Sequence, residues 1–184
     1  MIKFKEMKYV LVAIMSLFFI VSCAKNKKED TSQKTEKKAI KTIKKVEVPK
    51  KEKFITVDSD GVVNVSMITN DRMKFNLREI KVKAGQKVKL TLTHTGKLNK
   101  NIMGHNVVFL NKGVKRSTFA SKAAASREND YIPEGTTDVL AYTIMLGGGE
   151  KTTIEFTAPE AGIYDYICSF PGHYAMMKGE LIVQ

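Results

Sequence analysis

The chain has 184 residues, of which 27% are charged and 43% hydrophobic, and its 31 basic and 19 acidic residues give a net charge of +12. This length accommodates one ordinary domain with some additional sequence. The basic excess is unevenly placed: residues 24–53 carry twelve lysines and five acids, a net +7, whereas residues 54–184 carry only +3. Because the part that can fold is nearly neutral, we do not expect nucleic acid as a partner.

The first 22 residues have the features of a lipoprotein signal peptide. Three lysines among the first eight residues precede an apolar run, residues 9–21, that is too short to be a secure membrane span. The run ends in "IVSC", residues 20–23, which resembles the site at which bacterial lipoproteins are cut before a cysteine that becomes lipidated. Cys23 is therefore the expected lipid attachment site. The alternative is a signal anchor in which Cys23 has no role.

Residues 23–53 are expected to form a flexible tether that follows the lipid. The segment contains no glycine, no aromatic residue and few apolar residues after Cys23, so it cannot bury enough surface to fold. Its lysines are suited to attract anionic headgroups. We expect the protein at the bacterial cell envelope, lipid-anchored on the periplasmic or cell-surface side. Ala24 is not the aspartate that retains some lipoproteins in the inner membrane, which favours the outer membrane.

From residue 54 onward, short runs rich in valine, isoleucine, threonine and aromatic residues predict β-strands. The eight predicted strands are residues 61–68, 75–83, 87–94, 105–110, 139–145, 152–157, 162–168 and 179–183. Between the fourth and fifth, the alanine-rich segment 113–133 predicts a short helical flap. The spacing predicts an all-β, eight-stranded sandwich spanning residues 54–184, which is large enough to bury a core without a disulfide.

The stretch "CSFPGHYAMMKG", residues 168–179, gathers metal-binding side chains in one loop. Cys168, His173 and Met177 follow the spacing C-x4-H-x3-M, and the Pro-Gly pair between them favours a bend. A lone cysteine in an oxidising compartment is normally paired or avoided, so a metal that protects it is expected. Two histidines, one cysteine and a weak axial methionine form a blue-copper electron-transfer centre. The second histidine is expected from "MGHN", residues 103–106, as His105.

The stretches "CSFPGHYAMMKG" and "NIMGHNVVFL", together with the separation of His94 from His105, closely resemble the azurins, a family of cupredoxins. The resemblance covers most of residues 61–184 and implies a Greek-key cupredoxin sandwich that binds one copper ion. It implies that the equatorial ligands are His105, Cys168 and His173. The long axial ligand is then the thioether of Met177, and the carbonyl of Gly104 approaches from the opposite side. Met176 precedes the matching position and is not a ligand.

The same resemblance assigns roles around the copper. The backbone N–H groups of Asn106 and Phe170 are expected to donate to the Cys168 sulfur, and the Asn106 side chain to tie the two ligand loops together. His94 is expected to lie near the site without binding copper, either as a titrating group or as a satisfied core histidine. His173 is expected to reach the surface within an apolar docking patch, which consists of Met73, Leu98, Ile102, Met103, Phe170 and Ala175.

The function implied is that of a single-electron carrier cycling between Cu(II) and Cu(I), not of an enzyme. Its partners are expected to be redox proteins such as c-type cytochromes or copper or haem reductases. The alternatives are a copper storage or delivery protein, and a lipoprotein that keeps the fold without copper. A copper enzyme is disfavoured because the chain has only three histidines. Individually, Cys168 and Met177 are also compatible with plain core packing.

Overall fold

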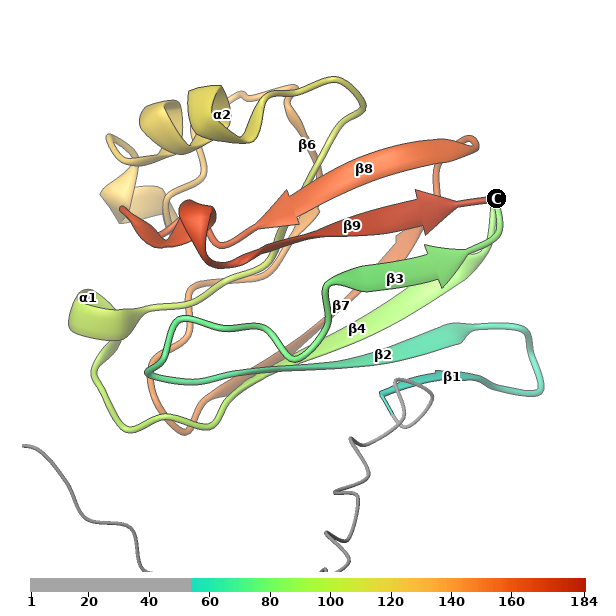
Figure 1. Ribbon diagram of the computed structural model, residues 1–184, viewed down its shortest axis with the longest axis horizontal. Helices are drawn as coiled ribbons and strands as arrows, with labels where there is room; N and C mark the ends of the chain where they lie inside the picture. Colours follow the sequence, from blue (N-terminus) through green and yellow to red (C-terminus); the bar gives the residue numbers. More distant parts are fainter. Residues whose placement is uncertain (1–53) are drawn as a thin grey trace, which may run out of the picture. The chain divides into compact units, whose positions relative to one another are not determined.

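The computed structural model describes residues 54–184 (Figure 1). The predicted signal peptide, Cys23 and the tether lie outside the described residues and stay predictions. The strands of the described part are β1 (Ile55–Val57), β2 (Val63–Thr69), β3 (Glu79–Val82), β4 (Lys87–His94), β5 (Val108–Leu110), β6 (Val139–Tyr142), β7 (Lys151–Thr157), β8 (Gly162–Ile167) and β9 (Lys178–Val183). None of the described helices is long and apolar enough to cross a membrane.

The strands form two sheets that pack face to face as the expected sandwich (Figure 1). One sheet has the order β1-β2-β4-β7 and the other β3-β9-β8-β5-β6. The pairs β2 with β4 and β3 with β9 are parallel, and the remaining pairs are antiparallel. The two edge strands β6 and β7 therefore belong to different sheets.

Side chains along the strands are alternately buried and more exposed, and the buried ones form the core between the sheets. In β2 the side chains of Val63, Val65 and Met67 are buried while the residues between them are more exposed, as expected for a strand with one face inward. The inward residues of β4 continue the same layer. From the other sheet, Tyr166 packs its ring 5.4 Å from that of Phe109, and its hydroxyl donates to the Leu77 carbonyl. Each large side chain buried in this way contributes roughly 2 kcal/mol.

The expected all-β sandwich is confirmed, but the described residues form nine strands instead of eight, and several strands have other bounds than predicted. β1 was not predicted. The predicted strand 75–83 forms only at β3, although Phe75 and Leu77 are buried alternately. The reason is Asn76, whose side chain accepts from the Ile68 N–H at 2.7 Å and donates to the Ser66 carbonyl at 3.2 Å, replacing a strand ladder beside β2.

Helical segments gather at one end of the sandwich (Figure 1). The predicted flap contains α2 (Arg116–Ala123), which buries Phe119 and two alanines over the outer side of the β5-β8 sheet, and the 3₁₀ helix η2 (Arg127–Asn129). The short helix α1 (Lys100–Met103) was not predicted; the Asn99 side chain begins it by accepting from the Asn101 N–H at 2.8 Å. A second 3₁₀ helix, η3 (His173–Ala175), precedes β9.

Candidate metal site

Two loops at this end bring His105, Cys168 and His173 together. His105 precedes β5 and is fixed by a pair of backbone hydrogen bonds with Leu146 rather than by the longer strand that we predicted. Cys168 directly follows β8, and His173 begins η3 after Gly172, whose φ of 83° lies in the left-handed region that favours glycine. The loop is closed where the Cys168 N–H donates to the Met177 carbonyl at 3.0 Å.

The donor atoms of these side chains converge. The Cys168 Sγ lies 3.9 Å from Nδ1 of His105 and 3.7 Å from Nδ1 of His173, and all three donor atoms lie within 4.8 Å of one another. The Gly104 carbonyl oxygen approaches to 3.8 Å from the same sulfur. Cys168 and His105 are fully buried, and His173 is 5% exposed. The arrangement is a single closed site with one side chain that reaches the surface.

A metal ion fits between these donors. Metal–thiolate and metal–imidazole bonds of about 2.3 and 2.05 Å, at an angle near 120°, place sulfur and nitrogen about 3.8 Å apart. The observed separations of 3.7 and 3.9 Å match that value, so the donors need not move apart to admit an ion. The combination of one thiolate and two imidazoles suits copper.

Hydrogen bonds set which nitrogen of each histidine is available. Nε2 of His105 lies 3.0 Å from the Asn70 carbonyl, which can only accept, so the proton is on Nε2 and Nδ1 presents its lone pair to the site. The His94 ring stacks on His105 with centroids 4.5 Å apart. Its Nδ1 accepts from the Gly96 N–H and its Nε2 donates to the Met103 carbonyl. His94 is therefore a buried histidine beside the site. Both of its ring nitrogens are hydrogen-bonded, so neither has a lone pair available for a metal.

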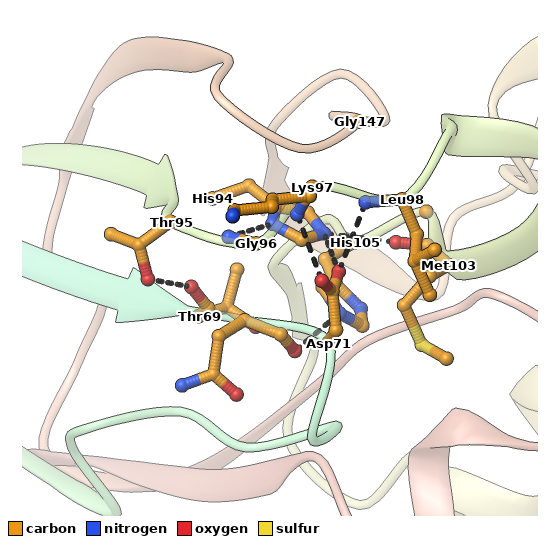
Figure 2. Close-up of polar contacts among 12 residues, drawn as sticks. Thr69, Asp71, His94, Thr95, Gly96, Lys97, Leu98, Met103, His105 and Gly147 are labelled. Atoms are coloured by element: carbon orange, nitrogen blue, oxygen red, sulfur yellow. Dashed lines mark hydrogen bonds and ion pairs between the residues drawn. The ribbon is translucent and has the colours of Figure 1, made fainter.

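Asp71, which the sequence did not single out, holds the loops around these histidines (Figure 2). Its carboxylate accepts from the N–H groups of Lys97 and Leu98 at 2.8 and 3.3 Å, and one oxygen lies 3.9 Å from Nε2 of His94. The Lys97 hydrogen bond is the main reason that the pKa of Asp71 lies below its usual range. Gly96 is required here, because a Cβ at this position would collide with the Asp71 carboxylate and the His94 ring.

Burial keeps the donors neutral in the absence of a cation. It raises the pKa of the Cys168 thiol to about 12, against the opposing effect of hydrogen bonds from the backbone N–H groups of Asn106 and Phe170. It also lowers the pKa of His105 to about 4, with further help from His94, and lowers the pKa of His173. A cation at the centre reverses this balance for the thiol, since it stabilises the thiolate directly.

The stability of the metal-free chain is expected to depend on pH through His105. Unfolded histidine takes a proton near pH 6.5, whereas folded His105 does so only near pH 4. Its contribution is therefore complete above pH 6.5 and is lost as the pH falls toward 4. Between pH 7.5 and 5 we expect a loss of about 2 kcal/mol in urea unfolding. The His105→Gln variant should show a shallower dependence; an unchanged slope would contradict this origin.

The remaining predicted site residues lie around the same point. Met177 is fully buried, and its N–H donates to the His173 carbonyl at 2.8 Å. Gly104 is buried; a Cβ there would collide with the Lys100 carbonyl and crowd Met145, so glycine lets the chain pass. The Asn106 side chain donates to Ser169 Oγ at 2.8 Å and accepts from the Ser169 N–H at 2.9 Å, which joins the two ligand-bearing segments.

Of the predicted docking patch, Phe170 contacts His173, and the other members differ in exposure. Phe170 is half-buried, and its ring centroid lies 4.5 Å from that of His173. Among the other residues of the predicted patch, Leu98 and Ile102 are 40% and 64% exposed, Ala175 is exposed, and Met73 and Met103 are half-buried. Met176, adjacent to Met177 in the chain, is 52% exposed instead of buried.

Comparisons with known proteins agree with this site. Residues 61–184 match the family model described as copper binding proteins, plastocyanin/azurin family. Azurin-2 of Alcaligenes xylosoxydans xylosoxydans is 39% identical over 117 residues, which are 61% of this chain and 91% of the relative; azurin of Alcaligenes faecalis is 39% identical over 122 residues, 64% and 95%. A solved azurin, Az-iso2 from Methylomonas sp. strain J, superposes with a TM-score of 0.61 at 32% identity, covering 66% of this chain and 97% of that one.

Proposed function

The chain belongs to the plastocyanin/azurin family of copper-binding proteins and has the cupredoxin fold, and on that premise we propose that it is a single-electron carrier of the bacterial cell envelope. The observation that carries the proposal is the closed, buried convergence of Cys168 Sγ with the Nδ1 atoms of His105 and His173. Copper held by such donors accepts and returns one electron between Cu(II) and Cu(I).

The proposed equatorial ligands are His105, Cys168 and His173, with Met177 as the weak axial ligand and the Gly104 carbonyl on the opposite side. The position of the Gly104 oxygen, 3.8 Å from the sulfur, supports its inclusion. For Met177, support comes from its complete burial and from its backbone bonds to both Cys168 and His173. Burial and these bonds limit how far the donors can rearrange when the charge at the site changes, which favours rapid electron transfer.

Residues around the donors are proposed to tune the reduction potential. Hydrogen bonds from the backbone N–H groups of Asn106 and Phe170 stabilise negative charge on the Cys168 sulfur. Asn70 keeps the proton of His105 on Nε2, so that Nδ1 stays a donor atom. His173 is the proposed exit for the electron, since it alone of the three reaches the surface, within the apolar patch. Small apolar patches suit brief encounters between redox proteins.

Partners and location follow from the whole sequence. We propose that the electron passes between redox proteins, such as c-type cytochromes or copper or haem reductases, and that the lipid on Cys23 and the tether 23–53 hold the domain 54–184 at a membrane. Thirty residues of flexible chain give an average reach of about 30 Å. The carrier is thereby restricted to partners near that surface, on the periplasmic or cell-surface side, and the outer membrane is the preferred site.

A visible absorption spectrum tests the proposal. After addition of Cu(II), we expect an intense band toward the red that ascorbate bleaches and an oxidant restores, because a thiolate bound to Cu(II) gives a strong charge-transfer transition. A colourless protein would contradict both the site and the function. Rapid loss of copper to a chelator, with the band initially present, would instead favour copper storage or delivery, which needs an exchangeable site.

A further inference from the structure

Exposed basic residues are next to members of the apolar patch in the sequence. Four exposed basic residues are interleaved with the patch along the chain: Arg72 and Lys74 flank Met73, Lys97 precedes Leu98, and Lys100 begins α1, which contains Ile102 and Met103. We call Arg72, Lys74, Lys97 and Lys100 the basic rim. Within residues 54–184, no acidic side chain forms an ion pair with any of the four.

The loops that carry the rim and the patch lie together at the metal end. The Asn70 carbonyl accepts from His105, and the next residue, Asp71, accepts from the N–H groups of Lys97 and Leu98, so the loop after β2 lies against the loop after β4 (Figure 2). Asp71 is the sole acid in segments 70–74 and 95–103. Its negative charge offsets one of the four cations, so the two segments keep a net charge of +3.

The charge around the patch is one-sided. On the flap side, Glu128 and Asp130 line the same hollow as Lys100, beside Arg127. The ligand loop 168–177 contains no aspartate, glutamate, lysine or arginine. A partner that covers His173 therefore meets apolar surface at the centre, cations on the β2-β3 loop and α1 side, and mixed charge on the flap side.

We propose that this surface docks a redox protein whose own contact face has an apolar centre and carboxylates along one edge, and that the basic rim sets the orientation of that partner over His173. This inference rests on the proposed electron-carrier function and adds the chemistry of the partner. Complementary charge at the edge of a small apolar contact raises the association rate and fixes orientation while leaving the contact easily broken.

The test compares two variants of equal charge in the reduced, copper-loaded full chain in non-ionic detergent. Lys74→Glu/Lys100→Glu alters the rim. Lys83→Glu/Lys87→Glu alters exposed lysines at the other end of the sandwich, where Lys87 lies about 23 Å along β4 from His94. The copper site of each variant is taken as intact when its visible spectrum in the oxidised form equals that of the unsubstituted chain. The rate of oxidation is measured by stopped-flow with two oxidants. One is ferric cytochrome c whose lysines have been succinylated so that its surface is acidic, and the other is hexacyanoferrate(III).

We expect the rim variant to react about tenfold more slowly with both oxidants at low salt, the control pair to change less than twofold, and the difference to vanish near 0.5 M salt. Equal slowing in both variants would overturn the proposal, since only net charge would then matter. Slowing with hexacyanoferrate alone would also overturn it, because the rim would attract small anions without orienting a protein. Failure of the proposed function itself is distinguishable: no variant would show a reducible visible band.

Discussion

Replacement of Cys168 by serine is expected to abolish the intense visible band of the copper-loaded chain completely. The band requires a thiolate, and the serine hydroxyl has a far higher pKa in a pocket that already raises the pKa of the thiol to about 12. The two imidazoles remain, so weak and pale Cu(II) binding is compatible with this result. The measurement is a copper titration followed by absorption, with circular dichroism to show that the sandwich still forms.

Two methionine variants provide the matched comparison for this result. Met177→Leu removes the proposed axial thioether, and we expect the band to persist while the reduction potential rises, since a weak axial donor favours Cu(II) over Cu(I). Met176→Leu makes the same chemical change at the neighbouring side chain, which is 52% exposed, and should leave both quantities unchanged. Loss of all copper from Met177→Leu would show that Met177 is a strong ligand; a band that survives in Cys168→Ser would refute the site.

The sequence was informative where function depends on side-chain type and spacing, and silent where it depends on the backbone. Cys168 and His173 share one short loop, so their spacing alone predicts that they can meet. The Asn70 carbonyl, which orients His105 from 35 residues away, leaves no signal because any residue has a carbonyl. Asp71 is similar: an acid in a loop is ordinary, and its role appears only when segment 97–98 folds against it.

The errors in the predicted strands have a related cause. Buried alternation at Phe75 and Leu77 is the pattern of a strand, but hydrogen bonds decide whether a ladder forms, and the Asn76 side chain takes those positions on β2. The expected strand from His105 is likewise reduced to one bridge with Leu146 before β5 begins. At Asn76 side-chain hydrogen bonds replace the ladder, whereas after His105 the ladder is interrupted because the Val107 N–H donates to Thr143 Oγ1 at 3.0 Å. Hydrophobic periodicity reveals neither of these bonds.

Replacement of Asn106 by alanine is expected to destabilise the metal-free chain by about 3 kcal/mol and to accelerate copper loss to a chelator by 10-fold or more. The Asn106 side chain is fully buried and makes three hydrogen bonds, two with Ser169 and one to the Asp130 carbonyl at 3.2 Å. Alanine leaves the buried Ser169 N–H without its acceptor, and it disconnects the segment of His105 from the loop of Cys168. Urea unfolding and the decay of the visible band measure the two effects.

A graded control separates the tie between the loops from general loss of packing. Ser169→Ala removes only the hydrogen bond from Asn106 Nδ2 to Ser169 Oγ and keeps the Ser169 N–H paired with Asn106 Oδ1, so we expect a loss of about 1 kcal/mol and little change in copper release. Asn111→Ala removes one bond, to the Thr137 carbonyl, away from the ligands. If Asn106→Ala releases copper no faster than Asn111→Ala, the side chain of Asn106 stabilises the fold without holding the two ligand segments together. The rigidity proposed for the site must then come from the backbone bonds of loop 168–177.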